Sequence, residues 1–207
     1  MKKRVGILLA LAVLCGTVRA ADRESAMLQQ APELHADALH AALASYDCLS
    51  EEGAAKRPVL SVIDYALPST AKRLFVFDLA EGRLLYSERV AHGKNSGDDV
   101  ATSFSNADGS LMSSLGAFVT EGTYTGDNGY SLRLRGTEPL VNDRAEARAI
   151  VMHGAAYVSD ASVKILGRLG RSFGCPAIRL EIAHALIDRI KDGSVLYAWH
   201  PSVAVAR

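Results

Sequence analysis

The chain has 207 residues, of which 49% are hydrophobic and 22% are charged, with 23 basic and 23 acidic residues. This composition excludes general disorder and supplies enough apolar residues for the core of one domain with a small appendage. The even balance of charge provides no electrostatic basis for binding nucleic acid.

The N-terminal segment 1–20 has the pattern of a secretory signal peptide. Three basic residues at 2–4 precede the apolar run 5–13, and compact residues at 18 and 20 are typical of a cleavage site. Because the run is too short to span a membrane stably, we expect cleavage after Ala20 or Ala21 and no membrane insertion afterwards. Cleavage removes four basic residues, which leaves 19 basic and 23 acidic residues and a net charge of −4.

The next segment, 21–58, is predicted to be a helical flank followed by a linker. Leucines recur at near-helical spacing with alanines between them, which predicts a helix over 25–48. The charged stretch 51–58 contains glycine and proline, so it is expected to connect this helix to the main domain.

From Val59 onward the sequence predicts a mainly β domain, 59–207, with flanking helices. The long polar segment 93–114 is expected to be a functional loop, and an apolar stripe predicts a helix over 181–191. Many short strands with few helices favour a β-sandwich or barrel-like core. The strands are expected at 59–65, 73–79, 83–91, 116–120, 131–135, 149–153 and 194–199.

The strongest chemical signal is a cysteine that directly follows a glycine, Cys175 after Gly174, with His153 at the end of a short apolar run upstream. A thiol nucleophile needs a base and a backbone N–H that stabilises the oxyanion. His153 is the candidate base, either accepting the proton during attack or forming a thiolate–imidazolium pair. The alternatives are a structural cysteine and a core histidine.

Two cysteines remain after cleavage, Cys48 and Cys175. In an exported protein such a pair suggests a disulfide, which would exclude a permanent nucleophile at Cys175. Cys48 lies at the end of the predicted helix, and we expect it to be a small buried hydrophobic residue instead. The histidines are scattered without metal-ligand spacing, so the sequence predicts no metal site.

Seven segments of the sequence, taken in chain order, resemble the L,D-transpeptidase catalytic domain, in particular the divergent second branch of the YkuD-like family. The resemblance covers about residues 60 to 199. The matching segments are 90–97, 104–106, 113–116, 124–126, 131–134, 150–155 and 171–177.

The resemblance implies that Cys175 is the nucleophile, that His153 is its base, and that Ser172 and Gly174 are also part of the catalytic motif. Ser172 would either orient the base or hold a turn. Phe173 departs from the better-known branch, which has a histidine at that position.

Three further residues, Arg171, His92 and Asn106, are candidate substrate-binding residues. Arg171 could bind a carboxylate of the stem peptide or could be a solvated surface residue. His92 and Asn106 could line the acyl-donor pocket or could satisfy backbone groups of the long polar loop.

The resemblance implies an exported enzyme of the periplasm or cell wall, without metal or organic cofactor, that joins peptidoglycan stem peptides through a cysteine thioester. An L,D-carboxypeptidase or related cysteine peptidase would differ only in what captures the thioester. A non-catalytic peptidoglycan-binding module is the alternative from another class. The sequence leaves the oligomeric state open.

Overall fold

The computed structural model describes residues 22–203. The predicted signal peptide and both of its possible cleavage points lie outside these residues. No helix within the described range is long and apolar enough to cross a membrane.

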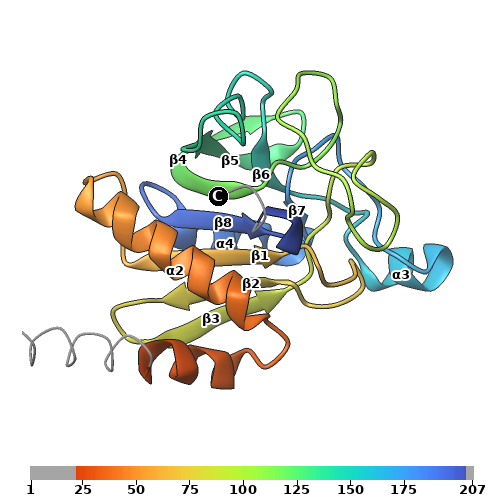
Figure 1. The fold of residues 1–207 in the computed structure, drawn as a ribbon. Coiled ribbons are helices and arrows are strands. Elements are labelled where there is room, and N and C mark those ends of the chain that lie inside the picture. The colour runs from red at the N-terminus through yellow and green to blue at the C-terminus, as the bar shows by residue number, and fades with distance from the viewer. Residues whose placement is uncertain (1–21, 204–207) are drawn as a thin grey trace, which may run out of the picture.

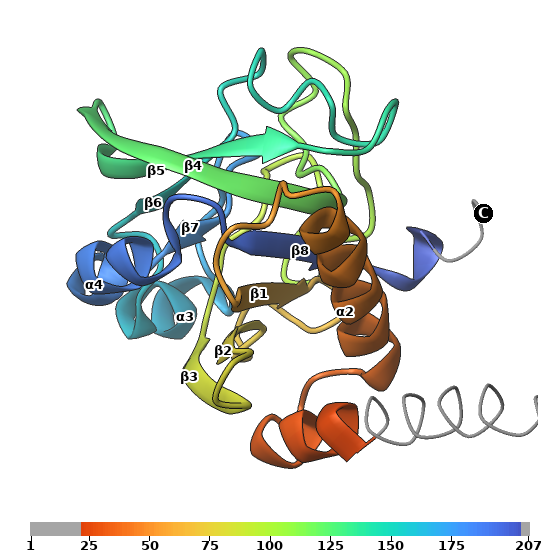
Figure 2. The ribbon, with the colours of Figure 1, turned by 90° about the vertical axis from the view of Figure 1, so that its left-hand side faces the viewer.

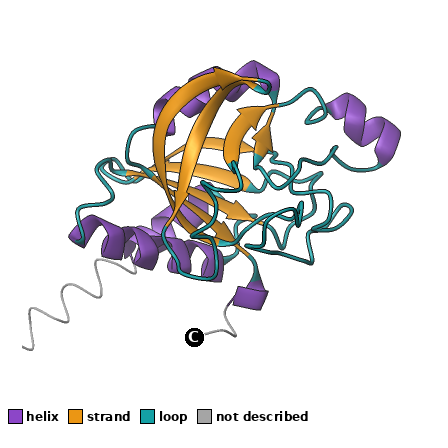
Figure 3. Ribbon diagram, turned by 90° about the horizontal axis from the view of Figure 1, so that it is seen from above, coloured by secondary structure: helices purple, strands orange, loops and turns teal. Residues whose placement is uncertain are grey.

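The described residues form one curved eight-stranded sheet with helices on its two faces (Figures 1 and 3). The strand order is β3-β2-β1-β8-β4-β5-β6-β7, with parallel pairing only at β1–β8 and β6–β7. The mainly β, barrel-like fold class predicted from the sequence is therefore confirmed. The strands are β1 (Val59–Asp64), β2 (Leu74–Asp78), β3 (Arg83–Glu88), β4 (Gly116–Gly126), β5 (Gly129–Gly136), β6 (Val151–Gly154), β7 (Ala177–Ile178) and β8 (Val195–Trp199).

Two helices cover opposite faces of the sheet (Figure 2). Helix α2 (Ala36–Glu51) packs on β1, β8 and β4, whereas α4 (Leu180–Ile190) packs on β6, β5 and β1. Each face has its own apolar core because side chains alternate across a strand. In β1, for example, Leu60 and Val62 belong to the α2 core, and Ile63 belongs to the α4 core. Short elements complete the fold: α3 (Asp160–Leu166) and the 3₁₀ turn Pro201–Val203.

The single helix expected over 25–48 is wrong, because the structure has a helical segment at 22–30 and a separate α2. Pro32 lies between them, and proline disfavours helical backbone at the preceding residue and lacks an N–H donor. The start of α2 is held by Asp64 at the end of β1, whose carboxylate accepts the His35 N–H at 3.1 Å and contacts His35 Nδ1 at 2.7 Å. The N-terminal flank is therefore integral to the core.

The α4 core offers a direct test of the fold. We expect Leu186→Ala to lower the free energy of unfolding by about 2–5 kcal/mol, because Leu186 is fully buried and its truncation leaves a cavity. Ile165→Ala in α3 is the matched control, since Ile165 is 79% exposed and its truncation should change stability by less than about 0.5 kcal/mol. Urea denaturation measures both, and equal losses would contradict the assignment of the core.

Candidate active site

At one edge of the sheet, the strand that holds His153 lies beside the short strand that follows Cys175. His153 lies in β6, where it pairs with Ser131 of β5 on one side and Ala177 of β7 on the other. Cys175 lies two residues before Ala177, and β6 and β7 run parallel. This register sets Cys175 beside Val151, two positions from His153 along β6, so the predicted nucleophile and its predicted base lie at the same edge of the sheet.

A sharp turn before β6 surrounds the Cys175 sulfur. The thiol donates to the Ala149 carbonyl at 3.6 Å, and the Val151 N–H donates to Sγ at 3.5 Å. Ala149 has a φ of 52°, a left-handed conformation that non-glycine residues rarely adopt. The strand expected from 149 therefore begins only at Val151. Strained backbone of this kind concentrates at functional sites.

Burial favours the neutral forms of both reacting groups. It raises the pKa of the half-buried Cys175 thiol, and the Val151 N–H and the Arg148 charge only partly offset this. Burial also lowers the pKa of His153, against a contact of Nδ1 with the Gly154 carbonyl at 3.0 Å. Both shifts oppose charge separation, so the resting site is a neutral thiol beside a neutral imidazole rather than an ion pair.

The contact with Gly154 also sets the tautomer of His153. A carbonyl only accepts, so Nδ1 carries the proton. Nε2 then has a free lone pair, and it has no hydrogen-bond partner within residues 22–203. This nitrogen is the one available to take a proton from the thiol.

Ser172 holds the turn that leads to the nucleophile. Its hydroxyl donates to the Cys175 carbonyl at 2.6 Å and accepts the Gly174 N–H at 3.1 Å. The Gly174 N–H is therefore already used. The Cys175 N–H has no acceptor among the residues that the structure describes, which leaves it as the donor available to an oxyanion.

Gly174 serves a close approach between two backbones. Its φ is 126°, and a Cβ at this position would lie 2.8 Å from the Met112 carbonyl oxygen. The long loop thus packs directly on the residue before the nucleophile. The role that Gly174 has in the structure is therefore to let this loop approach, and its predicted part in catalysis stays a prediction.

A chain of serines anchors the beginning and end of that loop. The Ser113 hydroxyl donates to the Gly174 carbonyl at 3.2 Å and accepts the Gly93 N–H at 3.0 Å. The Ser113 N–H donates to Ser96 Oγ at 2.9 Å. The predicted loop is therefore present, and it is ordered by its own polar residues against the site (Figure 1).

His92 is 1% exposed, with both ring nitrogens engaged inside the protein. Nδ1 accepts from Arg73 Nη2 at 2.7 Å, and Nε2 donates to the Gly97 carbonyl at 3.2 Å. Burial, followed by the Arg73 charge, lowers the pKa of His92 to about 4, so the ring is neutral at pH 7. These contacts give His92 a role in holding the loop; its predicted contact with substrate stays a prediction.

Arg171 and Asn106 also contact the loop or its neighbour. Arg171 Nη1 donates to the Gly97 carbonyl at 2.8 Å and to Asp98 at 2.9 Å. Asn106 donates to Asp143 at 2.6 Å and accepts the Arg144 N–H at 3.2 Å. Both residues therefore brace the loop, and binding of a stem peptide by either residue remains to be tested.

Sequence reasoning missed Arg148, whose guanidinium binds the loop through four hydrogen bonds near the nucleophile. It lies in a polar stretch rich in alanine and arginine, where an arginine is typical of a solvated surface. Only the tertiary structure reveals its partners.

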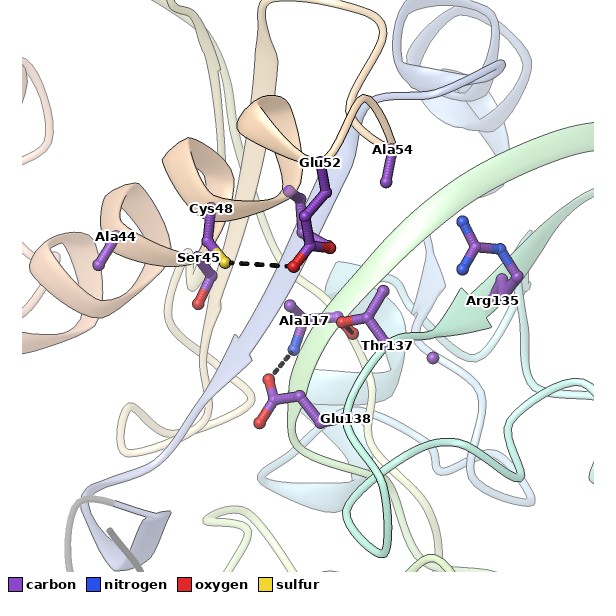
Figure 4. A pocket seen from close by; sticks show the side chains of 11 residues that line it. Ala44, Ser45, Cys48, Glu52, Ala54, Ala117, Arg135, Thr137 and Glu138 are labelled. Carbon is purple, nitrogen blue, oxygen red and sulfur yellow. Dashed lines mark hydrogen bonds between the residues drawn. The ribbon is translucent and has the colours of Figure 1, made fainter.

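Cys48 and Cys175, the two cysteines that the structure describes, are both free and lie in different parts of the molecule. Cys48 was expected to be buried, but it is exposed near the end of α2, 3.6 Å from Glu52 Oε1. The buried stripe of α2 passes through Leu39, Leu43 and Leu49, and Cys48 faces outside it. Cys48 lines a hollow between α2 and the β4–β5 hairpin, shared with Arg135 and Glu138 (Figure 4). Cys175 does not line this hollow.

Residues 30–199 match a sequence model of the L,D-transpeptidase catalytic domain. This range covers most of the chain and contains Cys175 and His153. The protein therefore belongs to the L,D-transpeptidase catalytic-domain family, as the sequence motifs indicated.

Solved structures with a similar fold include an L,D-transpeptidase from Mycobacterium smegmatis (16% identity, TM-score 0.44, covering 69% of this chain and 59% of that one). L,D-transpeptidase 1 of Mycobacterium tuberculosis has 13% identity and a TM-score of 0.40, with 69% and 62% of the chains covered. The helical cell shape determining protein Pgp2 of Campylobacter jejuni has 16% identity and a TM-score of 0.43, with 72% and 52% covered. The chain thus spans less than two thirds of the length of these proteins. No curated protein matches the chain.

The packing of the loop on the site predicts a sharp difference between two glycines. A Cβ at Gly93 would lie 2.5 Å from the Leu111 carbonyl oxygen, whereas a Cβ at Gly122 would meet nothing within 4 Å. We expect Gly93→Ala to destabilise the protein by about 1–3 kcal/mol and to expose the loop to protease, because backbone has to move. Gly122→Ala should leave stability within about 0.5 kcal/mol. Urea denaturation and limited proteolysis measure both, and an intact loop in Gly93→Ala would contradict this packing.

The neutral resting pair predicts the pH dependence of thiol alkylation. In a Cys48→Ser variant, the rate with iodoacetamide should be low at pH 7 and should rise with a midpoint above about 8.5, the pKa of an unperturbed cysteine. The sign follows from the raised pKa of Cys175, which keeps the thiol protonated below that pH. A midpoint below pH 7 would instead show a resting ion pair. Cys48→Ser/Cys175→Ser supplies the background rate.

Proposed function

We propose that this protein is an exported L,D-transpeptidase that cross-links or remodels peptidoglycan stem peptides through a thioester at Cys175. One observation carries the proposal. A half-buried thiol contacts the strained turn at Ala149, which leads into the strand that holds a histidine with a free Nε2 lone pair. The predicted signal peptide supports export to the periplasm or cell wall, and the family supports a peptidoglycan substrate.

In the acylation step, Cys175 Sγ attacks the carbonyl of the third residue of the stem peptide. The thiol leaves the Ala149 carbonyl, and its proton passes to His153 Nε2 as the C–S bond forms. The carbonyl oxygen becomes an oxyanion that accepts from the Cys175 N–H, a contribution of about 3 kcal/mol in other acyl transferases. The bond to the terminal D-residue then breaks, and His153 returns the proton to its amine.

The second step reverses this order. An amine from a neighbouring stem attacks the thioester, His153 takes the amine proton, and the C–S bond breaks as the thiolate recovers a proton. Water in place of the amine would give a carboxypeptidase, and a free D-amino acid would give exchange. All three outcomes use the same residues, so the acceptor decides the reaction.

The direct test incubates the mature protein with purified disaccharide-tetrapeptide and determines product masses. A dimer lacking one D-residue indicates transpeptidation, and a disaccharide-tripeptide indicates hydrolysis. Cys175→Ala should abolish both products, whereas Cys48→Ala should retain them. If either product persists in Cys175→Ala, the assignment of the nucleophile fails; binding of muropeptide without turnover by the wild type would favour a binding module.

The role of His153 predicts a matched pair of variants. His153→Gln should lower kcat/KM by about 10²–10⁴-fold through loss of the base, whereas His184→Gln on the surface of α4 should not change it. Since burial lowers the pKa of His153, the acid limb of wild-type kcat/KM should fall below pH 6.5 and disappear in His153→Gln. An acid limb above pH 7, or one retained in the variant, would contradict the role of this residue.

A further inference from the structure

Arg148 joins the long loop to the turn that surrounds the nucleophile. Nη1 donates to the Ser105 carbonyl at 2.7 Å and to Ser114 Oγ at 2.5 Å. Nη2 donates to Ser110 Oγ at 3.0 Å and to the Met112 carbonyl at 2.8 Å. All four acceptors belong to one loop, so a single planar group holds both of its sides.

The same guanidinium lies against the residue before Cys175. Nη2 is 3.5 Å from the point where a Cβ on Gly174 would lie, and the Met112 oxygen that it binds is 2.8 Å from that point. In the chain, Arg148 directly precedes Ala149, whose carbonyl accepts a hydrogen bond from the Cys175 thiol. The group therefore touches the nucleophile's turn from the loop side.

The positive charge of Arg148 is not cancelled by its hydrogen bonds. Its four acceptors are neutral carbonyl and hydroxyl oxygens, and arginine stays protonated throughout the physiological range. Asp108, a nearby acid, is ion-paired with Arg144. Burial lowers the pKa of Arg148, whereas Asp108 and an ionised Cys175 raise it, so the thiolate and the guanidinium favour each other's charged forms.

We propose that Arg148 is a positioning residue of this active site. Its forked bonds fix the loop over the Gly174–Cys175 turn, and its charge favours the thiolate that forms when Cys175 gives its proton to His153. The inference rests on the proposed function only for the identity of the reaction, because the effect on the thiol can be measured without substrate.

The surroundings of the thiol support an assignment to Arg148 specifically. Tyr65 and Tyr157 also face Cys175, but burial raises the pKa of both, that of Tyr157 to about 12, so they stay neutral. His153 is neutral as well, because burial lowers its pKa. Among residues 22–203, only the Val151 N–H and Arg148 lower the pKa of Cys175. Arg144 does not act on the thiol, and its side chain pairs with Asp108 on the outer part of the same loop.

The test compares three variants in a Cys48→Ser background: Arg148→Gln, Arg148→Lys and Arg144→Gln. Iodoacetamide alkylation of Cys175 across pH reports on the thiolate, and turnover of disaccharide-tetrapeptide gives kcat and KM. Arg148→Gln should move the alkylation midpoint up by about one pH unit and slow alkylation at pH 8 about tenfold, since an opposite charge is removed. Arg144→Gln should match the parent.

Arg148→Lys separates charge from geometry. Lysine keeps the charge but not the fork, so the alkylation midpoint should stay near that of the parent while KM rises as the loop loosens. This variant decides alone if Arg148→Gln fails to fold, as monitored by circular dichroism. The proposal is overturned if Arg148→Gln leaves the alkylation profile unchanged, if Arg144→Gln shifts it equally, or if Arg148→Lys moves the midpoint without changing KM. An inactive parent with a shifted profile in Arg148→Gln would defeat the proposed function and not this inference.

Discussion

The position of a two-residue strand, β7, is the constraint on which the site depends. Residues 177–178 are too short to form an element alone, and they are held from both sides. On one side β6 pairs with them in parallel, and Ala155 donates to the Ile178 carbonyl at 2.8 Å. On the other side Ala91 donates to the Ala177 carbonyl at 2.8 Å. This double support fixes Cys175 beside Val151 on β6, the strand that also holds His153.

The same support explains why a long loop belongs to the site. The chain leaves Ala91 and continues along the nucleophile turn, where Ser172 donates its N–H to the His92 carbonyl and accepts from Lys94. The loop then returns over Gly174 through Met112 and Ser113. Backbone carbonyls along this path accept hydrogen bonds from the side chains of Arg73, His92 and Arg171. Without these bonds the carbonyls would lack partners. Two residues that were predicted to bind substrate, His92 and Arg171, thus form hydrogen bonds to the loop.

Much of the fold could be predicted from local patterns. Short runs rich in Val, Ile, Leu, Phe and Tyr indicated the strands, and the apolar stripe with Leu186 and Ile190 indicated α4. The helix break at Pro32 and the left-handed backbone of Ala149 were not predicted. In each case the apolar pattern of a helix or strand continues across one residue whose backbone interrupts the element. Cys175 and His153 were predicted because their residue types can carry the chemistry, and their catalytic roles stay predictions. Arg148 could not be found, since its meaning depends on contacts with residues 34 to 43 positions away.

Burial has the same effect on the two predicted reacting groups. Burial at the sheet edge raises the pKa of the Cys175 thiol and lowers that of the His153 imidazole, so it disfavours charge on both groups. In the proposed reaction the Val151 N–H and the Arg148 charge favour the thiolate during proton transfer, and the Cys175 N–H stabilises the oxyanion. The central claim is that a stem peptide becomes covalently bound to Cys175. Intact-mass spectrometry of the protein quenched during turnover of disaccharide-tetrapeptide, followed by peptide mapping, tests it most directly. The account predicts an adduct of the disaccharide-tripeptide acyl group on the peptide that contains Cys175; product formation with no adduct there, or with the adduct on Cys48, would contradict it.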